Sequence, residues 1–175
     1  MERKEALKVA HSGTLARLVE VLAALGRAGQ PLAAFQAVDQ AIEAEFGRAY
    51  TTILRITGGL HTERLFSTVP ETYPVGVRKT LPDTPRARRI VSTGAPFVAN
   101  SIGAIAAEYP DHDVVVRLGA ASLANIPTLY DGQVIGVLCV AGAGPRAADF
   151  GVAAMPFAQA LAAPILAAPS RAPAQ

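Results

Sequence analysis

The amino-acid sequence predicts an α+β fold, with a central antiparallel sheet that carries the terminal helices on one face and an irregular helical crossover on the other. Three observations lead to this expectation. Two helix-like segments open the chain, strand-like runs come in two pairs around tight turns, and a Pro-rich stretch separates the pairs. Hairpins build antiparallel sheets, and each sheet face must be covered by other elements.

The most informative stretch is residues 118–140, where two apolar runs flank the dipeptide Asp131-Gly132. Asp-Gly between strand-like runs is typical of a hairpin, because both turn positions need positive φ. The two runs are nearly uncharged, so we expect both faces of this hairpin to be covered.

Two polar residues, Ser122 and Asn125, lie in the first of these strands. They are three positions apart, so the alternation of a regular strand places them on opposite faces. Polar side chains on a buried sheet need hydrogen-bond partners. We expect Asn125 to share a face with Leu123, to bond to neighbouring backbone and to fix the packing of the hairpin against the crossover.

The remaining elements follow from periodicity and end signals. Residues 5–26 are expected to form a helix, in which a heptad-like stripe comprises Leu15, Leu18, Leu22 and Leu25. A second helix is expected over Pro31–Phe46, and two strands, Tyr50–Thr57 and Leu60–Val69, around Gly58-Gly59.

The crossover is expected to be irregular over Pro70–Pro85 and helical over Thr84–Thr93, with Thr84 as the cap. A short strand (Pro96–Ala99) and one or two short helices (Ser101–Leu118) follow, with Asp111 as a second cap.

The last helix is expected over Phe150–Ser170, a run without charge. The run is mostly Ala, so its hydrophobicity is low for a membrane span. Phe157, Leu161 and Ile165 recur at i, i+4 and i+8, which favours a buried or interface-forming amphipathic helix.

Composition narrows the class of protein. At 175 residues the chain is expected to be one domain, and its 51% hydrophobic and 17% charged content argues against disorder. A net charge of +2 gives no indication of a nucleic-acid or membrane partner. The charged start, MERKEALK, lacks the apolar core of a signal peptide, so we expect a cytoplasmic location.

Catalytic templates are missing from the sequence: there is no G-x-S-x-G, P-loop or H-E-x-x-H motif. His112 with Asp111 and Asp113 is either a metal site or, as we favour, a helix start with acidic residues near its positive end. The single cysteine, Cys139, is expected to be a buried, inert thiol. No catalytic residue, metal or cofactor is predicted.

A series of short motifs carries a family resemblance. They are S-x-x-P-x-x-YPVG-x-RK, DTP, G-x-PF, YPDH and LG-x-x-S-x-x-N-x-P, the last followed by G-x-x-x-G-x-L. Five of them in this order resemble a subfamily of small bacterial GAF domain proteins. The resemblance divides the chain into an N-terminal extension of the first helix (1–13), a GAF-like domain (14–167) and a disordered tail (168–175).

The resemblance implies a sensory or regulatory module that binds a small molecule, and many such domains dimerise. Any ligand is expected between the sheet and the crossover of residues 70–118, and to be small, partly apolar and anionic. We expect it to be bound by four residues: Tyr73, Arg78, Lys79 and Asn125. Arg78 and Lys79 are chosen because they belong to the YPVG-x-RK motif, and guanidinium and ammonium groups bind anions. Three other basic residues, Arg86, Arg88 and Arg89, either hold a carboxylate or phosphate or, as we favour, form a solvated helix face.

The sequence therefore predicts a non-catalytic regulatory module that acts as a homodimer and has neither a nucleic-acid nor a membrane partner. The sequence shows no kinase, helix-turn-helix or cyclase-sized extension, so output is expected through a protein partner or a rearrangement of the dimer. Two alternatives stay open: a ligand-free structural dimerisation module and, ranked last, a reductase of the same fold. The single cysteine fits a reductase poorly, because thiol-dependent reduction generally needs a resolving thiol.

Overall fold

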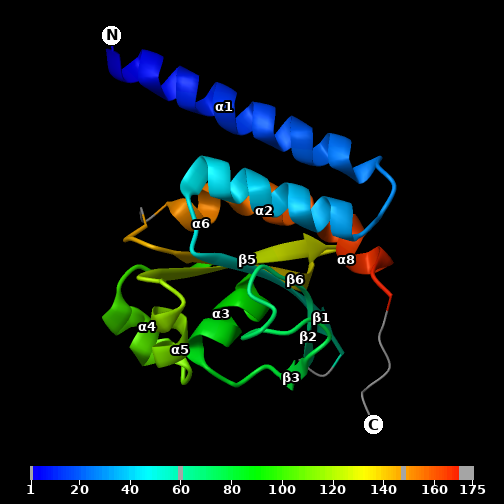
Figure 1. Ribbon diagram of the computed structural model, residues 1–175, viewed down its shortest axis with the longest axis vertical. Coiled ribbons are helices and arrows are strands. Elements are labelled where there is room, and N and C mark those ends of the chain that lie inside the picture. Colours follow the sequence, from blue (N-terminus) through cyan, green and yellow to red (C-terminus); the bar gives the residue numbers. More distant parts are fainter. Residues whose placement is uncertain (1, 59–60, 147–148, 170–175) are drawn as a thin grey trace.

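The protein is built on a six-stranded sheet, seen edge-on between two helical layers in Figure 1. The computed structural model describes residues 2–58, 61–146 and 149–169. The strands are β1 (Tyr50–Thr57), β2 (His61–Ser67), β3 (Arg78–Thr80), β4 (Phe97–Ala99), β5 (Ser122–Tyr130) and β6 (Gln133–Gly142). Their order is β3-β2-β1-β6-β5-β4, and every neighbouring pair is antiparallel.

Helices cover both faces of this sheet, as the sequence predicts. On one face lie α1 (Glu2–Leu25), α2 (Leu32–Phe46), α6 (Phe150–Ala153), α7 (Met155–Gln159) and α8 (Ala162–Ala167). On the other lie α3 (Pro85–Thr93), α4 (Ile102–Glu108) and α5 (His112–Arg117), all from the crossover (Figure 1). The predicted α+β class and the arrangement of its layers are confirmed.

The larger hydrophobic core lies between the sheet and the terminal helices. Phe157, Leu161 and Ile165 are fully buried in it, as their spacing predicts, against Leu138 of β6 and Ile126 of β5. A smaller cluster on the crossover side includes Tyr50, Ile105, Val115 and Leu123. The sheet therefore separates an apolar helical layer from a more polar cover.

The predicted Asp-Gly hairpin is confirmed. Tyr130 of β5 pairs with Gln133 of β6 across the turn. Asp131 and Gly132 have φ angles of 49° and 70°, so both turn positions adopt the positive φ that favours this dipeptide.

The prediction of a single C-terminal helix over Phe150–Ser170 is wrong. The described residues of this segment form three short helices, α6, α7 and α8. Two prolines account for the breaks. Pro156 and Pro164 have no N–H to donate, and each ring opposes the carbonyl four residues earlier. For Pro164 that carbonyl belongs to Ala160, where α7 ends.

Two further differences concern the ends of the sheet and of the chain. Residues Arg78–Thr80, expected to be irregular, form β3 and pair with His61–Glu63 of β2. Ala168 and Pro169 follow α8, and the Arg55 side chain donates to both carbonyls, at 2.7 and 3.4 Å. The rest of the predicted tail, residues 170–175, lies outside the described residues.

Within the described ranges, no helix has both the length and the apolar character needed to cross a bilayer.

Candidate ligand cavity

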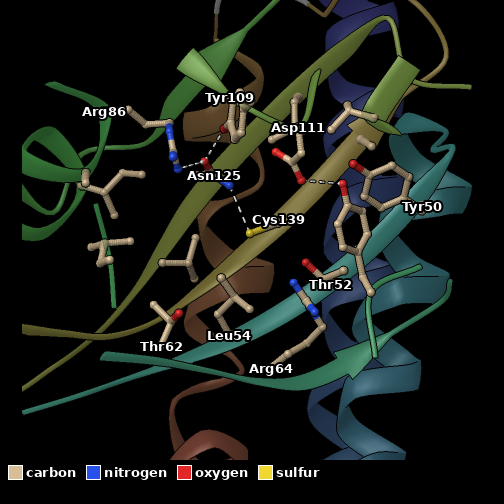
Figure 2. A pocket seen from close by; sticks show the side chains of 18 of the residues that line it. Tyr50, Thr52, Leu54, Thr62, Arg64, Arg86, Tyr109, Asp111, Asn125 and Cys139 are labelled. Carbon is tan, nitrogen blue, oxygen red and sulfur yellow. Dashed lines mark hydrogen bonds between the residues drawn. The ribbon is translucent and has the colours of Figure 1, made fainter. Parts of the chain in front are cut away.

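A cavity of about 140 Å³ lies between the sheet and the crossover, where the sequence predicts a ligand. Its floor is one face of four strands, and its roof comes from α3 and the segment around α4 and α5. Figure 2 shows this space from close by.

Strand alternation explains which side chains form the floor. Alternate residues of β1 face the cavity, as do Leu123 and Asn125 of β5 and Cys139 of β6. Ser122 donates instead to the Gly144 carbonyl at 2.6 Å and does not line the cavity. The predicted separation of Ser122 and Asn125 between the two sheet faces is therefore confirmed.

The residues at the start of α3 explain how this part of the roof is positioned. The Thr84 side chain accepts a hydrogen bond from the Ala87 N–H, and Pro85 follows as the first residue of α3, as predicted. This start directs Ala87 and Ile90 toward the sheet, where both are buried. Tyr109 ends α4 and also lines the cavity.

Asn125 is the centre of a polar cluster at one end of the cavity. Its Oδ1 accepts from the Tyr109 hydroxyl at 2.5 Å and from Arg86 Nη1 at 3.2 Å. Its Nδ2 donates to Cys139 Sγ at 3.0 Å (Figure 2). The expected bonds to neighbouring backbone are wrong, because the crossover brings two side chains within reach of Asn125. The expected contact between the hairpin and the crossover is confirmed by the same two bonds.

Arg86 does not belong to a solvated helix face, which corrects the sequence prediction for this residue. Its guanidinium carbon lies 4.3 Å from the centre of the Tyr109 ring, and the side chain is half-buried. Arg88 and Arg89 on the same helix are exposed, as expected.

A second polar group lies at the other end of the cavity. The Tyr73 hydroxyl donates to Asp111 Oδ2 at 3.0 Å, and the Tyr73 ring is 5.6 Å from the Tyr50 ring. Burial, and then the nearby Asp111 carboxylate, raises the pKa of Tyr73 to about 12. Asp111 precedes α5 but makes no capping hydrogen bond, so its predicted role as a side-chain cap is wrong.

Arg64 of β2 faces the same end of the cavity. Its guanidinium carbon lies 5.0 Å from the centre of the Tyr73 ring, and Nη1 donates to the Pro74 carbonyl at 3.2 Å. Burial lowers the pKa of Arg64, and the Asp111 charge partly opposes this shift. In Figure 2, Arg64 and Arg86 appear on opposite sides of the cavity.

Of the four ligand-binding residues that the sequence predicts, the structure brings two into this cavity. Tyr73 and Asn125 line it, whereas Arg78 and Lys79 lie on the exposed edge strand β3 and are not among the lining residues. Arg78 Nη2 contacts Glu63 Oε2 at 3.2 Å, and the Lys79 carbonyl accepts from Thr62 Oγ1 at 3.1 Å.

The cations that do line the cavity are Arg64, which the sequence does not single out, and Arg86, for which the sequence favours a solvated helix face. Arg64 alternates with Thr62 along β2, a signal that places both on one face. Arg86 carries no comparable signal, since it lies in a run of basic residues on a helix whose other arginines are exposed.

The Cys139 thiol opens onto the cavity between the two polar groups. Burial raises the pKa of this thiol, and its hydrogen bonds with Thr52 and Asn125 oppose the shift only in part. A raised pKa lowers the thiolate fraction at neutral pH, and the thiolate is the reactive form. The local chemistry is that of an unreactive thiol.

Comparisons with known proteins give the family. The GAF domain family profile matches residues 15–168 of the chain. No curated protein matches the sequence.

Solved structures share the fold at low sequence identity. The GAF domain of a phosphoenolpyruvate-protein phosphotransferase from Coxiella burnetii superposes with a TM-score of 0.68, at 15% identity over 89% of this chain and 94% of that one. The corresponding Acinetobacter domain gives 0.67, at 13% identity over 87% and 92%. The chromophore-binding domain of an unusual bacteriophytochrome, RpBphP3 from R. palustris, gives 0.62, at 11% identity over 86% of this chain and 59% of that one.

GAF domains are generally sensory or regulatory modules without catalytic activity, and the neighbours include a domain of a putative two-component sensor histidine kinase from Sinorhizobium meliloti 1021. The family match covers most of the chain, and the sheet order and helical layers agree with it. The chain therefore belongs to the GAF domain family.

Proposed function

We propose that this protein is a non-catalytic sensory or regulatory module of the cytoplasm, which binds a small, partly apolar anion in the cavity and acts as a homodimer. The observation that carries the proposal is the cavity itself, where an apolar floor meets two polar groups. Concave, mainly apolar sites with a few convergent polar groups are the usual form of small-molecule sites.

A ligand screen tests whether the cavity is used. We expect small organic acids to raise the midpoint of thermal unfolding, since a ligand at 100 times its Kd stabilises the folded state by about 2.7 kcal/mol. Neutral compounds and nucleotides serve as comparison sets, and mass spectrometry of the purified protein under native conditions checks for a retained ligand. If no compound shifts the midpoint and none co-purifies, the result supports the alternative of a ligand-free dimerisation module.

The homodimer is supported by an apolar stripe on α1, defined by Leu15, Val19 and Leu22. These side chains are 61%, 56% and 50% exposed and recur at i, i+4 and i+7. Leu18, between them in sequence, packs against the core instead. An apolar helical stripe left open to water favours association with another apolar surface.

The double variant Leu15→Glu with Leu22→Glu is expected to be monomeric and folded, because both side chains are exposed in the single chain. Light scattering at tens of micromolar measures the mass, and circular dichroism measures the fold. Ile102→Glu is the matched control: Ile102 is 51% exposed on α4, on the other side of the sheet, and its variant should remain dimeric. A monomeric wild type would contradict the proposed dimer.

The proposal of a non-catalytic role is tested at Cys139. Cys139→Ser is expected to leave the fold and ligand affinity nearly unchanged, because a serine hydroxyl also accepts the hydrogen bond from Asn125 Nδ2. Wild type is expected to show no turnover of methionine sulfoxide. Turnover by the wild type that disappears in Cys139→Ser would instead support the reductase alternative.

A further inference from the structure

The two guanidinium groups of the cavity are incompletely partnered by protein acceptors. Arg86 has five N–H donors, and its one hydrogen bond within the described part of the chain goes to Asn125 Oδ1. Its Nε is buried without an acceptor, as is that of Arg64. Across the described ranges, neither guanidinium lies within 4.0 Å of a carboxylate, although other arginines, such as Arg48 and Arg55, make such contacts.

The charges around the cavity sum to one positive charge. Arg64 and Arg86 contribute two positive charges and Asp111 one negative charge, and the other lining side chains are polar without charge or apolar. The pKa values of Tyr50, Tyr109 and Cys139 are raised, mainly by burial, so these groups stay neutral at pH 7. A bound monoanion would neutralise the excess charge.

The two ends of the cavity differ in what balances the cation. At the Arg64 end, a carboxylate belongs to the lining: Asp111 accepts from the Tyr73 hydroxyl, and the Tyr73 ring centre lies 5.0 Å from the Arg64 guanidinium carbon. At the Arg86 end, the guanidinium is held by the Tyr109 ring and the Asn125 amide, both uncharged. A half-buried cation held in place by neutral groups is arranged to receive an anion from outside the protein.

The size of the cavity limits the rest of the ligand. A volume of about 140 Å³ is close to that of an engineered apolar cavity, about 150 Å³, that binds benzene. The apolar lining includes Leu54, Ile56, Leu81, Ile90, Val115 and Leu123. The space therefore suits a branched aliphatic or single-ring body and is small for a nucleotide or a tetrapyrrole.

We infer that the cavity binds a small monocarboxylate with an apolar body, whose carboxylate pairs with the Arg86 guanidinium while Asn125 and Tyr109 hold that guanidinium in position. The inference rests on the proposed ligand-binding function. It adds the chemical class of the ligand and the arginine that pairs with its carboxylate. It assigns the anion to Arg86 of α3 and not to Arg78 or Lys79 of β3.

The test compares acids with neutral amides of the same shape, namely benzoate with benzamide and isovalerate with isovaleramide. Isothermal titration calorimetry on the full chain is expected to show each acid binding at least about tenfold tighter than its amide, the effect of a charged hydrogen bond. Arg86→Met is expected to weaken acid binding roughly 10- to 100-fold and to leave amide binding unchanged.

Two further variants make the comparison specific. Arg88 lies on the same helix as Arg86, but its side chain is 65% exposed. The Arg88→Met variant should therefore bind the acids as the wild type does. Arg86→Lys keeps the charge but lacks the planar fork, so its acid affinity should fall between wild type and Arg86→Met.

Amide binding as tight as acid binding in the wild type would overturn the inference and leave the proposed function standing. Equal acid affinity in wild type and Arg86→Met would overturn it in the same way. Absence of binding by all four compounds contradicts both the inference and the proposed function. If Arg86→Met fails to fold, the acid-to-amide ratio of the wild type and the Arg86→Lys affinity still decide.

Discussion

Replacing Glu63 by Gln is expected to lower the free energy of unfolding by about 3–5 kcal/mol, the usual effect of removing one partner of a buried ion pair. The Glu63 side chain is 2% exposed and its Oε2 lies 2.7 Å from Arg55 Nη2. Arg55 is itself buried, so Glu63→Gln would remove the carboxylate charge that lies beside its guanidinium. Urea denaturation monitored by circular dichroism measures the change.

Two controls separate charge from packing in this prediction. The double variant Arg55→Met with Glu63→Met should be more stable than Glu63→Gln, because it removes both charges of the pair, although it also removes the donor to the Ala168 carbonyl. Arg78→Met should have a smaller effect, about 0–1 kcal/mol, because the Arg78 side chain is 39% exposed. A loss below about 1 kcal/mol for Glu63→Gln would show that solvent reaches this pair.

The Arg55–Glu63 pair also has a structural consequence. Arg55 donates to the Ala168 carbonyl at 2.7 Å, so the pair ties the end of α8 to the strands β1 and β2. Thr62 and Arg64, which flank Glu63 in β2, face the cavity on the opposite side of the sheet. One strand therefore contributes to the candidate ligand site and to the anchor of the C-terminal segment.

The elements that the sequence predicts well are those with a local cause. Asp131 and Gly132 make a turn that needs positive φ, and Thr84 caps the helix that starts at Pro85. The general position of the cavity is predicted because an irregular segment has to cover one face of the sheet.

The elements that the sequence predicts poorly depend on contacts between distant segments. The three residues of β3 form a strand only because β2 offers them an unpaired edge. The partners of Asn125 come from α3 and the end of α4, which lie 39 and 16 residues earlier in the chain. Arg86 resembles its exposed neighbours in sequence, and its contacts with the Tyr109 ring and the Asn125 amide distinguish it in the structure.

In the Ala-rich C-terminal run, one prediction from the sequence is correct and another is wrong. Its apolar spacing correctly places Phe157, Leu161 and Ile165 in the core, although Pro156 and Pro164 divide the expected helix. Burial of a side chain depends on whether it faces the sheet. Phe157, Leu161 and Ile165 all face the sheet, although breaks separate the three short helices.

Leu161→Ala is accordingly expected to lower the free energy of unfolding by about 2–5 kcal/mol, the range for truncating a buried leucine. Leu161 is fully buried among core residues between the sheet and α2, in a run where most neighbours in sequence are alanines.

Leu166→Ala is the matched control, because it is the same substitution five residues later on a side chain that is 52% exposed. It is expected to change stability by less than about 0.5 kcal/mol, as is usual at exposed positions. Urea denaturation of both variants, at a concentration where their oligomeric state is the same, gives the comparison. Equal losses for the two variants would mean that α8 does not pack on the sheet as described, since the buried and the exposed leucine would then be equivalent.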